Sequence, residues 1–485
     1  MSTWWRAAIA ILLVGAALRL VGLNRPLFHV DEAVNGWFLD QALKGHDWVY
    51  NKDNFNGPTL LYSSLPWVRM VGLSDVSCRL VPVAFSLLTI ALILCLHPAL
   101  GRTAALWAAW WYAISPGAVY FARDYVHESV FVCFTLAAVV PWLHMERLGL
   151  WWTVMASFAA AALLFCTQET ALYPLLSLLA AEFLSNGERR LTRASPAAVV
   201  GAGLAGLLVF LAIWATLYSS FFLHPASLVD ALGAQPFWSH GGRADWPEPA
   251  WQYLLWLGQN EPLLAVLAVG AIGGLLRYPE RRTRFRKLIA WWLLGVLLFY
   301  SWPSHKTPWE CLDLILPLSL LAGVASEHLQ EVMATRHFGW CHLGWSVVML
   351  SQCVWLCFLH ADDPAVAYVS EPTAPATRAL LAQVQEGVAA AGHGRIACCA
   401  SMDDYWPLPW YLRDYADARW WATATMAAAS NPDVVIFRSD PNPDVDQTPV
   451  VETILSDDYE FVGKARIRDG VTLEVWRRRV SPLLR

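Results

Sequence analysis

Long apolar runs, separated by short polar connections, make up most of the first 360 residues of the chain. A helix that crosses the hydrocarbon core of a bilayer needs about 20 consecutive, mostly apolar residues. Runs of this kind, several of them short, predict about eleven spans. They cover residues 4–23, 77–97, 103–120, 128–145, 150–167, 170–184, 197–221, 251–276, 289–303, 308–327 and 342–360. The pattern predicts a mainly α-helical, polytopic membrane domain over residues 1–361.

The pattern changes after Ala361 to that of a small soluble α/β domain, predicted for residues 362–485. Helical periodicity extends over 377–391, and residues 395–400 and 433–438 have the composition of buried strands. Residues 459–477 are expected to form a hairpin that turns at Asp469-Gly470. With an odd number of spans before it, this domain would lie outside the cytoplasm.

Composition excludes an ordinary soluble protein. Hydrophobic residues make up 57% of the chain and charged residues only 15%, with a mean hydropathy of +0.40, whereas soluble domains carry about 25% charged residues. The net charge of -5 and the lack of a dense basic tract exclude nucleic acid as an expected partner. Most of the ten cysteines lie in apolar runs, where they behave as small hydrophobic residues.

The distribution of Lys and Arg predicts the sidedness of the spans, because short cytoplasmic loops are enriched in both. Alternate connections contain the basic residues Arg102, Arg147, Arg189, Arg190, Arg193, Arg336 and the run from Arg277 to Lys287. The opposite connections contain the polar motifs Asp31-Glu32, Arg123 to Glu128, Gln168-Glu169 and His305 to Trp309. We therefore expect the polar motifs to converge on the extracytoplasmic face.

Asp31 and Glu32 form the first candidate site, directly after the first apolar run. Carboxylates beside a bilayer are costly to desolvate, which favours a functional role. One carboxylate would accept a proton from an acceptor hydroxyl, and its neighbour would position a partner. The alternative is an acidic helix cap, since Asp is a common N-cap and a helix is expected to begin near Ala33.

A second cluster is expected at Arg123-Asp124 and His127-Glu128. On a helix that begins near Asp124, the side chains of Asp124, His127 and Glu128 would share one face. The alternative is an Arg-Asp ion pair that caps the helix.

Three further polar stretches remain open between a functional and a local role. Lys306 precedes Pro308, which suits the first turn of a helix, and its ammonium together with the helix N-terminus could neutralise a phosphate. It could equally extend toward lipid headgroups. Asn54 to Pro58 has the composition of a turn, and Gln168-Glu169 favours a local cap or pair.

These motifs, in this order, resemble the GT-C superfamily of membrane glycosyltransferases. The resemblance is carried by His29 to Ala33, Gly57-Pro58, Arg79 to Pro82 and Arg123-Asp124. It is greatest to the branch of protein O-mannosyltransferases and lipid A aminoarabinose transferases. The elements His127-Glu128 and Lys306 to Trp309 are similar to the archaeal and bacterial flippase-associated membrane protein family.

The resemblance implies a polyprenyl-phosphate sugar as donor, an extracytoplasmic acceptor and inversion at the anomeric carbon. It implies Asp31 as the catalytic acid of the first loop and the general base, with Glu32 as its companion and Asp124 as the second acid. Arg123, His127, Glu128 and Lys306 are the expected substrate-binding residues. The local pattern at Lys306 departs from that of the relatives, and only some relatives use a divalent cation. If one binds, Asp31, Asp124 and Glu128 are the candidate ligands.

Two other functions fit a polar cavity in a membrane protein. One is a non-catalytic flippase, carrier or assembly factor for lipid-linked sugars, and the other is a transporter with ionisable groups on a proton path. A transporter should show ionisable residues near mid-span and inverted repeats. The acids here lie at predicted helix ends, which favours the glycosyltransferase.

Overall fold

The computed structural model describes residues 3–51, 56–185, 194–239, 248–278, 283–303, 306–391, 394–421, 430–439 and 458–479. Two compact units emerge. The first contains Met1–Leu23, Gly45–Ala361 and Val366–Tyr368, and the second contains Asn24–Lys44, Asp362–Ala365 and Val369–Arg485. The segment Asn24–Lys44, which the sequence assigned to the membrane domain, therefore packs with the C-terminal residues.

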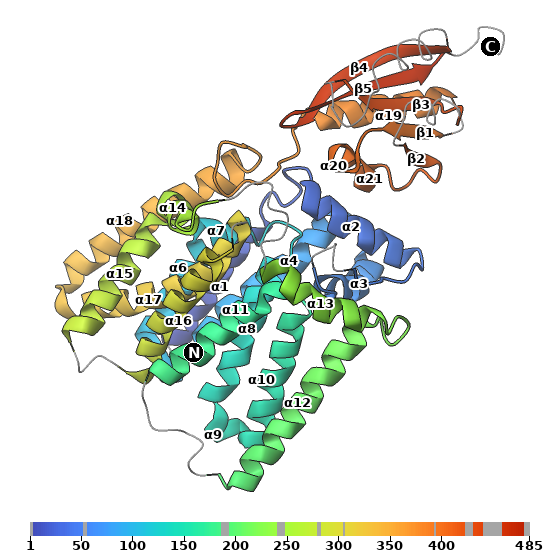
Figure 1. Cartoon of the computed structure of the whole chain (residues 1–485). Coiled ribbons are helices and arrows are strands. Elements are labelled where there is room, and N and C mark those ends of the chain that lie inside the picture. Colours follow the sequence, from blue (N-terminus) through green and yellow to red (C-terminus); the bar gives the residue numbers. More distant parts are fainter. Residues whose placement is uncertain are drawn as a thin grey trace. The chain divides into compact units, whose positions relative to one another are not determined.

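The first unit is a bundle of helices (Figure 1). Its first half contains α1 (Thr3–Leu20), α3 (Thr59–Val71), α4 (Asp75–Cys95), α5 (His97–Leu100), α6 (Arg102–Ile114), α7 (Pro116–Tyr120), α8 (Glu128–Leu143), α9 (Met145–Leu148), α10 (Leu150–Phe165), η2 (Glu169–Ala171) and α11 (Leu172–Leu184). Its second half contains α12 (Pro196–Tyr218), α13 (Ser227–Ser239), α14 (Gln252–Asn260), α15 (Pro262–Arg277), α16 (Arg284–Ser301), η5 (Pro308–Glu310), α17 (Cys311–Val332), α18 (Thr335–Val354) and η6 (Trp355–Leu359).

Helix α17 forms the centre of this bundle. It is apolar on all sides and its residues from Cys311 to Ser326 are buried, as expected for a helix surrounded by other helices. It packs against α6, α8, α15 and α16. A side chain at Gly323 would place its Cβ 2.4 Å from the carbonyl oxygen of Ala104, so the close approach of α17 to α6 requires glycine.

Other helices expose apolar surface of the kind that faces lipid. Helix α12 packs against α10 on one side, while Val200, Leu204 and Leu208 on α12 are largely exposed. A contiguous exposed apolar surface on a helix is typical of a membrane-facing position. Helices of this length and apolar exposure indicate an integral membrane protein.

The predicted spans coincide with helices, although the number of crossings stays a prediction. Each of the eleven expected ranges overlaps a helix of the first unit. Among the described residues, five helices are long and apolar enough to cross a membrane, or six if the bent pair α14 and α15 is one span. That pair bends by 110° at Glu261, inside the predicted span 251–276.

The second unit combines a five-stranded sheet with short helices. The sheet order is β2-β1-β3-β5-β4. The elements are α2 (Val30–Leu43), α19 (Thr377–Ala391), β1 (Ile396–Cys399), α20 (Met402–Tyr405), α21 (Leu408–Tyr411), β2 (Ala418–Trp421), β3 (Val434–Arg438), β4 (Tyr459–Arg468) and β5 (Val471–Arg478). Strands β2, β1 and β3 are parallel, and β5 is antiparallel to β3 and β4.

The elements predicted for this unit are confirmed. The helix over 377–391, the strands near 395–400 and 433–438, and the hairpin with its turn at 469–470 are all present. Gly470 has a φ of +67°, a conformation that glycine adopts without strain. The fold class, a helical membrane bundle with a small C-terminal α/β unit, is therefore correct.

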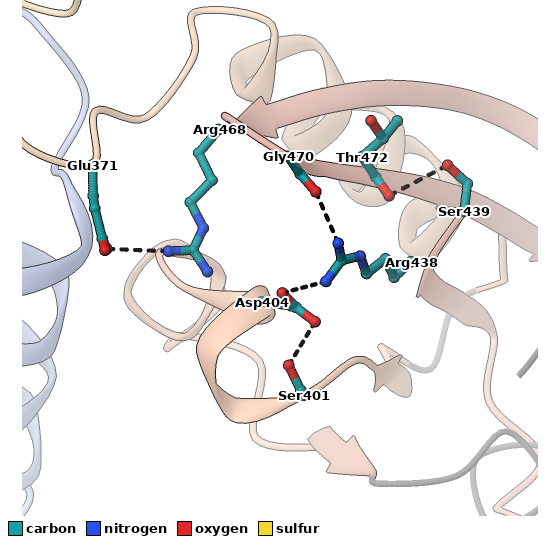
Figure 2. Close-up of polar contacts among 8 residues, drawn as sticks. All are labelled: Glu371, Ser401, Asp404, Arg438, Ser439, Arg468, Gly470 and Thr472. Carbon is teal, nitrogen blue, oxygen red and sulfur yellow. Dashed lines mark hydrogen bonds and ion pairs between the residues drawn. The ribbon is translucent and has the colours of Figure 1, made fainter. Parts of the chain in front are cut away.

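An arginine at the end of β3 connects three parts of this sheet (Figure 2). The guanidinium of Arg438 pairs with Asp404 at 2.7 Å and donates to the carbonyl of Gly470 at 2.9 Å. Asp404 also accepts a hydrogen bond from Ser401 at 2.5 Å. These contacts fasten the hairpin turn to the segment after β1.

Candidate functional site

Asp31 and Glu32 lie in the first turn of α2, in the second unit. The N-cap is His29: its Nδ1 accepts from the backbone N–H of Asp31 at 3.3 Å, and Glu32 accepts from the backbone N–H of His29 at 3.3 Å. Glu32 is fully buried, whereas Asp31 is exposed. The expected capping role thus belongs to His29 and Glu32, and the Asp31 carboxylate is accessible.

Arg123 lies in the connection between α7 and α8 and serves as a cap for α1. Its Nη1 donates to the carbonyls of Leu18 at 3.1 Å and Val21 at 2.6 Å, and its Nη2 donates to Gly22 at 3.1 Å. A cation at these carbonyls is favourable because the C-terminus of a helix is its negative end. Arg123 therefore has a structural role here, and substrate binding by this residue stays a prediction.

The expectation of a helix that begins near Asp124 is wrong. Helix α8 begins at Glu128, and residues 121–127 form turns and bends. Asp124 and His127 precede the helix, so helical spacing does not place their side chains on one face with Glu128. All three side chains are nonetheless buried.

The Gly57 segment is attached to the connection between α10 and α11. The N–H of Gly57 donates to the carbonyl of Thr167 at 3.0 Å, and the N–H of Thr59 donates to Cys166 at 2.9 Å. A Cβ at Gly57 would lie 2.2 Å from the Cys166 carbonyl oxygen, so only glycine fits. Part of the predicted turn 54–58 lies outside the described residues.

His127 and Glu128 contact these two connections. A hydrogen bond joins the imidazole of His127 to the backbone of Gly57, and burial lowers the His127 pKa to about 3, so the ring is neutral at pH 7. Glu128 Oε1 accepts from Nε2 of Gln168 at 2.8 Å. The structure thus brings together residues from three connections of the first unit. The sequence predicts that all three connections lie on the extracytoplasmic side.

Glu169 has a partner that the sequence did not reveal. Its Oε1 accepts a hydrogen bond of 2.6 Å from the hydroxyl of Tyr50. Burial raises the pKa of Glu169 to about 7, and the hydroxyl of Tyr50 opposes this rise. Gln168 makes no side-chain cap hydrogen bond, whereas the Glu169 carboxylate also bonds to its own backbone N–H. Both side chains bond to distant elements in addition.

Lys306 precedes two further acids in the first unit, the half-buried Glu310 and the buried Asp313. Its side chain is buried and its Nζ donates to the carbonyl of Pro303; burial lowers its pKa. The hydroxyl of Tyr253 donates to Glu310, and that of Tyr300 donates to Asp313 at 2.5 Å. Neither acid was predicted as a site residue, although the three-residue spacing of Glu310 and Asp313 at the start of an apolar run indicates that the two carboxylates share a helical face.

Tyrosine rings contact one another beside Glu310 and Asp313. The ring of Tyr300 lies 5.4 Å from that of Tyr173 on α11 and 5.9 Å from that of Tyr253 on α14. Tyrosine presents an apolar ring together with a hydroxyl that finds a polar partner when buried. The tyrosines supply the hydrogen-bond donors that these acids need inside an apolar bundle.

Among the described residues, no group of three or more His, Cys, Asp or Glu side chains is arranged to hold a metal ion. Asp31 belongs to the second unit, while Asp124 and Glu128 belong to the first. Metal binding by these three residues stays a prediction.

Comparison with known proteins supports the resemblance. A family described as dolichyl-phosphate-mannose-protein mannosyltransferase matches residues 66–214. No curated protein sequence matches the chain. The structure is similar to that of ArnT from Cupriavidus metallidurans, solved bound to undecaprenyl phosphate, with a TM-score of 0.62, 15% identity and 97% of each chain covered.

Two further solved structures share the architecture. The Archaeoglobus fulgidus oligosaccharyltransferase, solved with a tethered acceptor peptide, matches with a TM-score of 0.57 and 12% identity over 90% of this chain and 69% of that one. The mycobacterial arabinofuranosyltransferase AftD matches with a TM-score of 0.50 and 14% identity over 98% of this chain and 42% of that one. The family match over residues 66–214 and the shared fold agree with the resemblance to the GT-C superfamily of membrane glycosyltransferases.

Proposed function

We propose that the protein transfers a sugar from a polyprenyl-phosphate donor to an acceptor hydroxyl on the extracytoplasmic side of the cytoplasmic membrane, with Asp31 as the general base. The observation that carries this proposal is the contrast at the start of α2, where Glu32 is buried in a capping box and Asp31 is exposed. An exposed carboxylate on a fixed helix start is suited to accept a proton from a bound hydroxyl.

The proposed reaction is a single displacement. The acceptor oxygen forms a bond to the anomeric carbon as Asp31 takes its proton, and the bond from that carbon to the phosphate oxygen breaks. Polyprenyl phosphate leaves with the electron pair, and the anomeric configuration inverts. Lys306 balances the charge of the phosphate, because a cation at a developing anion lowers the barrier most where water is excluded.

Asp124 is proposed as the second acid, and His127 and Glu128 as groups that shape the donor site. His127 is neutral and buried, and it is bonded to the Gly57 segment. Glu128 is bonded to Gln168. Both side chains therefore hold connections in place, and their proposed part in binding is to fix the walls around the sugar.

The extracytoplasmic location of the C-terminal unit is part of the proposal. It is supported by the distribution of Lys and Arg between alternate connections. The acceptor would then approach from outside the cytoplasm. A protease added to sealed, right-side-out vesicles should cut the C-terminal unit, whereas protection of this unit would contradict the orientation.

The decisive experiment measures transfer and donor hydrolysis by the purified protein with a panel of polyprenyl-phosphate sugars. Asp31→Asn should lower the rate at least on the order of 100-fold, as expected for loss of a general base, and Asp124→Asn, at the proposed second acid, should also lower it. Asp414→Asn, at another exposed Asp of the second unit, is the matched control and should retain the native rate. Equal rates in all four proteins would remove the catalytic assignment.

The alternative function, a non-catalytic flippase or assembly factor for lipid-linked sugars, makes the opposite prediction. Such a protein would move a fluorescent polyprenyl-phosphate lipid between leaflets of a proteoliposome without consuming it. Asp31→Asn would leave that movement unchanged.

A further inference from the structure

The helix that carries Asp31 is packed against the C-terminal part of its own unit. Helix α2 contacts α21, and a Cβ at Gly36 would lie 2.7 Å from the indole ring of Trp410. Trp410 is fully buried, and the guanidinium of Arg413 lies 4.0 Å above its ring. The indole therefore has little freedom to move away from α2.

The residue at the entrance to α2 is fixed on three sides. The backbone N–H of Phe28 donates to the hydroxyl of Tyr411 at 2.8 Å, and its carbonyl accepts from Oγ1 of Thr373 at 2.7 Å. Its ring stacks on that of Trp410 with centroids 5.0 Å apart and an interplanar angle of 18°. Both backbone groups and the side chain of Phe28 are thus held by residues that come more than 340 positions later.

This fixation extends directly to Asp31. His29 follows Phe28, and the capping box joins His29 to the backbone N–H of Asp31 and to the carboxylate of Glu32. Hydrogen bonds therefore fix the chain at Phe28, His29, Asp31 and Glu32. The backbone that carries the Asp31 side chain is therefore fixed at the start of α2.

Helix α21 connects that arrangement to the sheet. Leu408 and Leu412 belong to the hydrophobic core formed with β1, β3 and β5, and Tyr411 packs against it. Trp410 and Tyr411 contact Phe28. One short helix therefore packs into the core of the C-terminal unit on one side and holds the start of α2 on the other.

We propose that the C-terminal part of the second unit acts as a positioning element for Asp31 by holding α2, with Trp410 and Tyr411 on that part and Gly36 on α2 as the positioning residues. This inference rests on the proposed function, because it concerns the geometry of the proposed base. In this proposal these residues act on the base through α2 and not on the substrate. Their role is to keep the start of α2 in one orientation, so that the carboxylate meets the acceptor hydroxyl.

The kinetic test separates positioning from binding. Trp410→Ala and Gly36→Ala should lower kcat on the order of 10- to 100-fold, the effect of displacing a reacting group by about 1 Å, and leave the donor KM within about twofold. Tyr411→Phe, which removes one hydrogen bond, should have a smaller effect in the same direction. Trp410→Phe should restore much of kcat, because it retains a ring against Phe28.

Matched controls exclude a general loss of folding. Trp476→Ala removes a tryptophan from the other core cluster of the same sheet, with Phe437 and Phe461 as ring neighbours. Gly270→Ala adds a Cβ to a helix where nothing lies within 4 Å. Both controls should keep the native kcat. The proposal is overturned if Trp410→Ala and Gly36→Ala also keep it, or if Trp476→Ala lowers kcat as much as Trp410→Ala does.

A second measurement does not depend on activity. Hydrogen exchange of peptides covering residues 28–40, measured without substrate, should become faster in Trp410→Ala and stay native in Trp476→Ala. Unchanged protection in Trp410→Ala would contradict the positioning role. A fully active Asp31→Asn would instead contradict the proposed base, and the exchange result would still decide whether the C-terminal unit holds α2.

Discussion

The hydroxyl of Tyr50 donates a 2.6 Å hydrogen bond to Oε1 of Glu169, and both side chains are buried. The two residues come from connections 119 positions apart in the chain. The contact fixes the segment before α3 to the start of η2. The backbone hydrogen bond from Gly57 to Thr167 joins the same two connections.

Tyr50→Phe should destabilise the protein, because it removes the donor from a buried carboxyl. The expected loss in the free energy of unfolding is about 1–3 kcal/mol. Thermal unfolding in detergent would measure it. In the background of Glu169→Leu, the same substitution should cost much less, and an equal cost in both backgrounds would show that the hydrogen bond does not contribute.

Glu169→Gln should change the pH dependence of stability. The folded-state pKa of about 7 lies above the usual 4.5, so the carboxyl favours folding fully below about pH 4.5, and this contribution is lost as the pH rises through about 7. The difference amounts to about 3 kcal/mol. Glu169→Gln should therefore gain stability relative to the native protein between pH 5 and pH 8. Parallel stability curves for the two proteins would contradict the raised pKa.

Gly57→Ala should disturb the connection between α3 and the end of α10. The added Cβ would lie 2.2 Å from the carbonyl oxygen of Cys166, and backbone groups cannot move aside as a side chain can. We expect a loss of about 1–3 kcal/mol, measured by thermal unfolding. Gly270→Ala, with open space around it, should be neutral or slightly stabilising.

Arg123→Lys distinguishes a cap from a substrate-binding group. Lysine keeps the charge but lacks the planar fork that reaches the carbonyls of Leu18, Val21 and Gly22. If capping is the role, the free energy of unfolding falls by about 2 kcal/mol and the donor KM stays close to native. A higher KM with native stability would assign Arg123 to substrate binding instead.

Lys306→Met should weaken donor binding, because it removes the cation proposed to face the phosphate. We expect the donor KM to rise about tenfold, equivalent to 1.4 kcal/mol. Lys306→Arg should retain most of the affinity. Titration with a short polyprenyl phosphate, followed by tryptophan fluorescence, would measure the affinity of both variants. If the native protein and Lys306→Met bind the lipid phosphate equally well, Lys306 is not part of the donor site.

The apolar spans were predictable from sequence because length and hydropathy alone determine where helices can lie in lipid. The break at Glu261 was not, because it depends on a distant contact. Its carboxylate accepts hydrogen bonds of 2.7 Å from the hydroxyl of Ser115 and from the backbone N–H of Gly117. No pattern in residues 251–276 indicates that these groups are nearby.

The candidate site was predictable only in part, for the same reason. His127, Glu128 and Gln168 carry polar groups in places where apolar residues surround them, and the structure joins them to other connections. Tyr50, Glu310 and Asp313 were missed. Each of these acids is hydrogen-bonded to a tyrosine, Glu310 to Tyr253 and Asp313 to Tyr300. The sequence does not indicate which acid a tyrosine in an apolar run will contact.

The contact of Phe28 with Tyr411 joins residues 383 positions apart. At a synthesis rate of about 5–20 residues per second, roughly 20 to 80 s separate their emergence from the ribosome. During that time Phe28 and the face of α2 around Gly36 have no Trp410 to pack against. The start of α2 can therefore reach its final arrangement only after residue 411 has been made, so the proposed base is positioned long after it has been synthesised.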